Sequence, residues 1–282
     1  MIAHPAPLDF DLSGIRLRVR GLPGEYERLL REEWAGFGAA APGTPFLDVA
    51  VRAGSEPEPR SPWDPKAMRS LLRSGSARYE IEEGAIEVGA DGKAALSLRS
   101  GAGSRTFLAL LNLIRAGLAW RMPSRGGAML HAAGIVVKGR AFLLVGPEGS
   151  GKTTWAGAGA AGGADVLGDD VVLVDRAPER FEALAAPLRP RSGALRLPGR
   201  WPLAAILLPR HGASPRLDPA AARDVYGRIL ANLPFLAEGF GADGRIPAAI
   251  EDLRASVPAR VLTFSPDPSF LAILSGFEAG PR

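Results

Sequence analysis

Apolar and polar positions follow two different spacings in the first 125 residues. Residues 15–20 alternate apolar and basic side chains, which predicts a half-buried strand. Residues 25–37 repeat apolar side chains at the spacing of one helix face. The other predicted elements are a strand at 46–51, a loop rich in Pro, Ser, Glu and Gly at 53–66, strands within 77–99 and a buried helix at 105–121. This mixture predicts a smaller α+β region over residues 1–125.

From residue 126 onward, short apolar strands alternate with helical segments. Residues 128–137 and 141–145 are predicted strands joined by a tight turn, and a helix is predicted at 152–161. The later elements are two short strands that flank 168–170, a strand at 203–208, a helix at 218–233 capped by Asp218-Pro219, a helix near 246–255 and a strand at 260–264. The pattern predicts a separate α/β domain over residues 126–282.

Composition narrows the function classes more than it narrows the fold. Of the 282 residues, 46% are hydrophobic and 23% are charged, which is typical of a folded globular chain. The formal net charge is +4, but the Arg residues are scattered rather than clustered, so nucleic-acid binding is not expected. Lys is rare and occurs only at positions 66, 93, 138 and 152.

Several kinds of site and location are not expected from the sequence. Without Cys, the chain has no disulfide, no thiol catalysis and no Cys-based metal site. The N-terminal residues lack the basic and apolar regions of a signal peptide, and no apolar run reaches the length of a membrane span. We therefore expect a cytoplasmic protein with no membrane partner.

One glycine-rich segment has the pattern of a phosphate-binding loop. Gly146, Gly151, Lys152 and Thr153 match G-x-x-x-x-G-K-[ST], with a predicted strand before the loop and a helix after it. In such loops the main-chain N–H groups surround a phosphate, the Lys side chain reaches the β- and γ-phosphates, and the Thr hydroxyl holds Mg²⁺. We therefore predict ATP and Mg²⁺ as cofactors, with Lys152 as a catalytic residue. The predicted nucleotide-binding residues are Gly146, Pro147, Glu148, Gly149, Ser150, Gly151, Lys152, Thr153 and Thr154.

Two adjacent carboxylates follow the phosphate loop at a short distance. Asp169 and Asp170 lie 17 and 18 residues after Lys152, between apolar segments. Paired carboxylates at the end of a buried strand need a cation or a proton nearby. One carboxylate could hold the metal ion and the other could accept the proton of an attacking hydroxyl. A solvated Asp-Asp turn is the alternative.

His131 and two arginines complete the set of candidate residues. His131 lies on the predicted strand before the loop strand, and antiparallel pairing of the two would bring it near the phosphates. A buried core histidine is the alternative. Arg189 and Arg191 could contact phosphate or an acidic substrate, or belong to a solvated loop.

Together these residues resemble the catalytic core of HPr kinase/phosphorylase and its relatives. The spacing carries the resemblance, because 15 residues separate His131 from Gly146 and 17 separate Lys152 from Asp169. The resemblance implies a mixed-sheet P-loop kinase core related to ATP-dependent phosphoenolpyruvate carboxykinase. It implies that Asp169 is the base, that Asp170 and Thr153 hold Mg²⁺ and that His131 supports the site. It also implies self-association into a homo-oligomer.

The resemblance leaves the phosphoryl acceptor open. It implies transfer of the γ-phosphoryl group of ATP to a serine or threonine hydroxyl of a small protein or peptide. The Glu-x-Arg-Gly signature of the bifunctional enzymes is absent after the aspartates, so phosphorylase activity is not implied. The alternatives are a metabolite kinase, a phosphoenolpyruvate carboxykinase-like enzyme and a nucleotide-gated binding module without chemistry.

Overall fold

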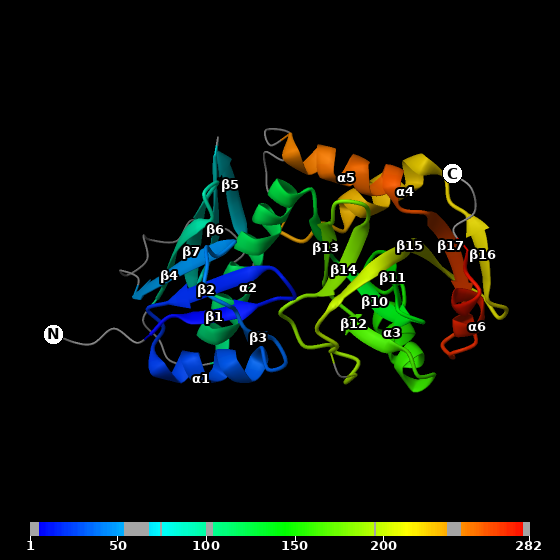
Figure 1. Cartoon of the computed structure of the whole chain (residues 1–282), viewed down its shortest axis with the longest axis horizontal. Helices are drawn as coiled ribbons and strands as arrows, with labels where there is room; N and C mark the ends of the chain where they lie inside the picture. The colour runs from blue at the N-terminus through cyan, green and yellow to red at the C-terminus, as the bar shows by residue number, and fades with distance from the viewer. Residues whose placement is uncertain are drawn as a thin grey trace. The chain divides into compact units, whose positions relative to one another are not determined.

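The chain folds as two compact units in the computed structural model (Figure 1). The described residues are 6–53, 68–73, 75–99, 104–194, 196–235 and 244–278. The first unit is Met1–Arg121 with Phe235–Gly244, and the second is Met122–Pro234 with Arg245–Arg282. From the sequence we expected a boundary between residues 125 and 126. The loop predicted at 53–66 lies, from residue 54 onward, outside the described residues.

A mixed sheet forms the centre of the first unit. The elements of this unit are β1 (Leu8–Asp11), β2 (Arg16–Arg20), α1 (Gly24–Glu33), β3 (Gly38–Ala39), β4 (Leu47–Ala53), β5 (Arg69–Arg73), β6 (Ser76–Ile81), β7 (Gly84–Gly89), β8 (Lys93–Leu98) and α2 (Ser104–Arg121). Within the described residues the eight strands have the order β3-β1-β2-β4-β8-β7-β6-β5. The pairs β2–β4 and β4–β8 are parallel and the others are antiparallel. Helix α2 packs on β4, β6, β7 and β8.

Local sequence explains the elements of this first unit. Leu17 and Val19 of β2 are fully buried, whereas Arg18 between them is partly exposed and pairs with Asp9 at 2.8 Å. Helix α1 ends at Glu33, earlier than the predicted residue 37. The backbone leaves helical geometry at Trp34, with φ of −101° and ψ of 20°, and Gly36 at φ 97° excludes a continuation of the helix to residue 37.

A second mixed sheet forms the centre of the second unit. The elements of this unit are η1 (Met122–Arg125), β9 (Ala128–Leu130), β10 (Ala132–Val137), β11 (Arg140–Val145), α3 (Lys152–Ala161), β12 (Asp165–Gly168), β13 (Val172–Arg176), β14 (Phe181–Ala185), β15 (Arg200–His211), β16 (Arg216–Pro219), α4 (Ala222–Ala231), α5 (Arg245–Ser256), β17 (Ala259–Phe264) and α6 (Phe270–Ser275). The described strands have the order β12-β10-β11-β15-β14-β13-β9, and β17 pairs with both β15 and β16. Strands β11, β15 and β17 run parallel, next to antiparallel pairs. The α/β class with mixed sheets is therefore confirmed.

Two predicted elements differ from the observed ones. The strand predicted at 128–137 is broken at His131, because the His131 N–H donates to the Asn232 carbonyl at 2.7 Å instead of to a neighbouring strand. The helix predicted at 218–233 begins only at Ala222, so the prediction that Asp218-Pro219 caps it was wrong. Asp218 lies in β16 opposite Val261, and its carboxylate accepts hydrogen bonds from two arginines.

The apolar core of the second unit lies between the sheet and the helices α3 and α6. Strand β10 is buried along its whole length, and α3 and α6 both pack against it (Figure 1). Trp155 of α3 is fully buried and stacks on Phe270 of α6, with ring centroids 5.4 Å apart. This packing fixes the start of α3, where the phosphate-binding pattern lies.

A buried ion-pair network lies between η1 and the strands β13, β14 and β15. The Asp175 side chain is 0% exposed, and it accepts two hydrogen bonds from Arg125, at 2.9 and 2.7 Å, and one from Arg200 at 2.7 Å. Arg200 also donates to Glu182 at 2.7 Å. Since a buried carboxylate without partners is costly, the two arginines are required for Asp175 to stay charged there.

No helix among the described residues is long and apolar enough to cross a membrane.

Candidate functional site

The phosphate-binding pattern forms the connection between β11 and α3. The loop after Val145 uses left-handed backbone at Gly149 and Gly151, with φ of 76° and 89°. Gly146 must be small, because a Cβ there would lie 2.5 Å from Pro209 Cγ and 2.6 Å from Ser150 Oγ. No side chain caps α3, so its first N–H groups are available to an anion.

Lys152 begins α3 and is only 6% exposed. Its Nζ donates to the carbonyl oxygens of Gly146 at 2.7 Å and Pro147 at 2.9 Å. Burial lowers the pKa of Lys152, while the nearby carboxylates of Asp170 and Glu148 act in the opposite direction. The lysine amine therefore lies inside the loop and also within the electrostatic field of Asp170 and Glu148.

The hydroxyl-bearing residues Thr153 and Thr154 follow in the first turn of α3, and both are exposed. Mg²⁺ bound to a nucleotide commonly takes one or two protein oxygens in addition to phosphates and water. Asp170 supplies a partly exposed carboxylate in the same unit. The oxygen donors present therefore fit a nucleotide-bound Mg²⁺, although no group of three or more His, Cys, Asp or Glu among the described residues could hold a metal by itself.

Antiparallel pairing brings His131 to the phosphate loop. Ala132 pairs with Val145 at the end of the two strands. His131 comes just before Ala132 and therefore lies next to the start of the loop at Gly146. The His131 Nδ1 is 3.1 Å from Asp170 Oδ1, and the two side chains are 33% and 19% exposed. Main-chain bonds hold both residues, because the His131 N–H donates to the Asn232 carbonyl at 2.7 Å and the Ala132 N–H donates to the Asp170 carbonyl at 3.1 Å. His131 and Asp170 therefore form a partly accessible pair next to the loop.

The two aspartates occupy different surroundings. Asp169 is 2% exposed, and its carboxylate accepts main-chain N–H bonds from Arg191, at 2.8 Å, and from Ser192. Each of its oxygens is therefore used to hold the segment that begins after β14. Asp170 is partly exposed and contacts side chains instead, namely His131 and Arg191.

The two candidate arginines lie on the segment that Asp169 holds. Arg191 Nη2 is 3.4 Å from Asp170 Oδ2, although the Arg191 side chain remains 74% exposed. Arg189 is also exposed. The structure thus brings Arg191 to the aspartate pair.

Three residues that contact the site are not among the candidates from the sequence. Asn232, at the C-cap of α4, fixes His131 through its carbonyl oxygen and had no sequence signal. Pro209 and His211, at the end of β15, lie against Gly146 and Gly151 of the loop. The parallel pairing of β15 with β11 explains their position, but it cannot be deduced from local periodicity.

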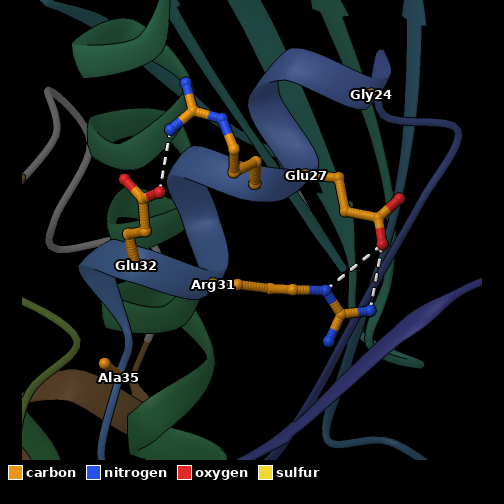
Figure 2. A pocket seen from close by; sticks show the side chains of 6 residues that line it. Gly24, Glu27, Arg31, Glu32 and Ala35 are labelled. Atoms are coloured by element: carbon orange, nitrogen blue, oxygen red, sulfur yellow. Dashed lines mark hydrogen bonds and ion pairs between the residues drawn. The ribbon is translucent and has the colours of Figure 1, made fainter.

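A surface depression in the first unit contains none of the candidate residues. It is lined by one face of α1 and by Ala35. Arg28 pairs with Glu32 at 2.8 Å, and Arg31 pairs with Glu27 at 3.0 Å, as Figure 2 shows for the second pair. Such pairs on an exposed helix are ordinary i, i+4 contacts. We assign no chemistry to it.

Comparison with protein-family models gives no match, and comparison with curated proteins gives none either. The geometry of the loop and the aspartate pair must therefore carry any argument about function.

Replacing Gly151 with Ala is expected to weaken binding of ATP and Mg²⁺ by about tenfold or more. A Cβ at φ 89° is strained, and it would lie 3.2 Å from His211 Cε1 and 3.3 Å from Phe264 Cζ, so the loop must shift. Isothermal titration of the full chain measures the change. Gly163→Ala is the matched control, since its φ is 90° at the far end of α3 with nothing within 4 Å. Wild-type affinity in Gly151→Ala would contradict this account of the loop.

Proposed function

We propose that the second unit is an ATP-dependent phosphotransferase that moves the γ-phosphoryl group to a hydroxyl acceptor. The observation that carries the proposal is the convergence of Lys152, Asp170 and His131 at a glycine-rich loop between a buried strand and a helix. This arrangement supports a P-loop kinase core of the HPr kinase and phosphoenolpyruvate carboxykinase type.

The loop and the helix after it bind the triphosphate. No side chain caps the N–H groups at the start of α3, so they can bind an anion, and the Lys152 ammonium adds a full charge beside the Gly146 carbonyl. Phosphoryl transfer depends mainly on positioning and on stabilising charge that spreads over the transferred group. Thr153 would hold Mg²⁺ together with phosphate oxygens and water, and the metal neutralises charge on the phosphates when it is bound. Asp170, which the resemblance assigns to Mg²⁺, serves as the base in this proposal.

The two aspartates have different roles in this proposal. The acceptor hydroxyl oxygen forms a bond to the γ-phosphorus, the bond from that phosphorus to the β,γ-bridging oxygen breaks, and ADP leaves. Asp170 accepts the hydroxyl proton, because its carboxylate is partly exposed and contacts His131 at 3.1 Å. Asp169, which the resemblance implies is the base, positions the segment with Arg191 instead, since both of its oxygens hold main-chain N–H groups.

The surroundings of Asp170 favour an acidic or phosphate-bearing acceptor. Arg191 is 74% exposed while its guanidinium reaches Asp170, and Arg189 is exposed on the same segment. A serine or threonine hydroxyl in a small protein or peptide fits the proposed chemistry. A metabolite kinase and a phosphoenolpyruvate carboxykinase-like enzyme share the same phosphate loop and differ in the acceptor.

Transfer of label from γ-labelled ATP tests the proposal. We expect the full chain with Mg²⁺ to label a hydroxyl in a panel of peptides, small proteins and metabolites, and we expect Lys152→Ala to lower the rate at least about a hundredfold because the transition-state charge loses its counter-charge. Arg216→Ala, an exposed residue on β16, is the control. Tight ATP binding with neither label transfer nor hydrolysis would instead support a nucleotide-gated binding module.

A further inference from the structure

Three neighbouring parallel strands end on the same edge of the second sheet. Strand β11 pairs with β15, and β15 pairs with β17, all in parallel. In sheets of this kind, ligands bind outside the carboxyl ends of parallel strands. The carboxyl end of β11 is the phosphate loop, and the other two strands end at His211 and Phe264. A ligand group that extends from the loop toward β15 and β17 meets these strand ends.

The side chains at these strand ends lie against the phosphate loop. The Cβ position of Gly151 is 3.2 Å from His211 Cε1 and 3.3 Å from Phe264 Cζ. The rings of His211 and Phe264 are 5.7 Å apart between centroids and tilted by 42°. Phe264 is buried at 2% exposed, whereas His211 is exposed. An exposed aromatic ring is therefore held next to the loop by a buried one.

Hydrogen bonds fix the backbone around this ring pair. Gly212 N–H donates to the Phe264 carbonyl at 3.1 Å, which ties the end of β15 to the end of β17. After β17, the Asp267 carboxylate accepts the Ser269 N–H at 2.8 Å and the Ser265 hydroxyl, so the turn toward α6 is ordered by its own side chains. The side chain of the neighbouring Arg210 is engaged with Asp218 at 3.0 Å.

We propose that His211, supported by Phe264, is the platform on which the base of the bound nucleotide stacks. The inference rests on the proposed nucleotide binding and adds the part of the ligand that the phosphate loop does not contact. A flat ring that is exposed on one side and supported on the other suits an aromatic base, because stacking needs a π-face and no particular hydrogen-bond pattern. The chemical class of ligand is therefore a nucleoside triphosphate, with its phosphates at Lys152 and its base at His211.

Two probes that share the phosphates test the proposal by titration of the full chain with Mg²⁺. ATP carries a base and inorganic tripolyphosphate does not. We expect His211→Ala to raise the ATP dissociation constant roughly tenfold and to leave that of tripolyphosphate unchanged. His211→Phe keeps a flat ring and is expected to retain ATP binding near the wild-type value. Arg210→Ala, at the adjacent position, is expected to leave the ratio of the two dissociation constants unchanged.

The outcomes separate this inference from the proposed function. Suppose that Lys152→Ala weakens binding of both probes. If His211→Ala then leaves ATP binding unchanged, or weakens binding of both probes equally, the base platform is wrong and the phosphate site stands. The same holds if wild-type protein binds tripolyphosphate as tightly as ATP. If wild-type protein binds neither probe, the nucleotide site and the platform are both wrong.

Discussion

Asp170→Asn is expected to slow phosphoryl transfer by about a hundredfold to ten-thousandfold, the usual range for loss of a general base. The amide cannot take the hydroxyl proton, while its size and its contact with His131 are largely kept. Nucleotide binding involves Lys152 and the loop, so the ATP dissociation constant is expected to change by much less than kcat. Single-turnover transfer and ATP titration of the same preparation measure the two effects.

Asp169→Asn provides the matched comparison. Its carboxylate holds the N–H groups of Arg191 and Ser192, and an amide can accept only one of these bonds at its oxygen. The expected result is a loss of about 1–3 kcal/mol of stability and a smaller loss of kcat, with a raised KM for the acceptor because Arg191 is displaced. The role of Asp169 as the base would instead be supported if this variant abolished transfer at unchanged melting temperature while Asp170→Asn kept the wild-type rate.

Asp175→Ala is expected to destabilise the second unit by about 3–5 kcal/mol. The Asp175 carboxylate is 0% exposed and receives bonds from both Arg125 and Arg200, so its removal takes one carboxylate partner away from each guanidinium group. Denaturant unfolding measures the loss. Asp252→Ala is the control, because Asp252 is 44% exposed in its pair with Arg176 and such a pair contributes about 1 kcal/mol or less. Equal losses in the two variants would contradict the importance of burial.

The same network predicts how the Asp175 effect depends on pH. Burial alone would raise the pKa of Asp175, but the hydrogen bonds and charges of Arg125 and Arg200 outweigh it and hold the pKa below its usual range. A carboxyl whose folded-state pKa is lowered stabilises the fold above its unfolded-state pKa, about 3.9, and loses this contribution as the pH falls through the folded-state value. The stability difference between wild type and Asp175→Ala should therefore be full at neutral pH and shrink below about pH 4.

The loop and helix α3 could be predicted because their signals are local. Glycines at fixed spacing, an apolar strand before them and small helix-forming residues after them lie within one short segment, and α3 has the predicted bounds 152–161. The partners of the aspartates could not be predicted in this way. Asp169 is held by residues 22 and 23 positions further along the chain, and the His131 main chain by Asn232. Such contacts depend on how the sheet brings distant segments together, and sequence periodicity carries no information about that.

Local sequence patterns predict single strands and helices, but they do not predict which strands pair with one another. The prediction of a capped helix from Asp218-Pro219 used a local rule, whereas pairing with β17 determined the structure there. The position of His211 beside the loop follows from the parallel register of β15 between β11 and β17. Long-range strand pairing therefore explains both the wrong helix cap at Asp218-Pro219 and the position of His211.

The scarcity of lysine makes the phosphate loop chemically distinguishable. The chain has only four lysine side chains. The structure describes three of them, and of these three Lys152 is the buried one. Acylating reagents attack the neutral amine, and a lowered pKa increases the neutral fraction of Lys152 relative to an ordinary lysine, while its burial in the loop limits reagent access. Peptide mapping after brief acylation can therefore follow this one side chain, and protection by a phosphate ligand would be visible against the exposed Lys93 and Lys138 as internal standards.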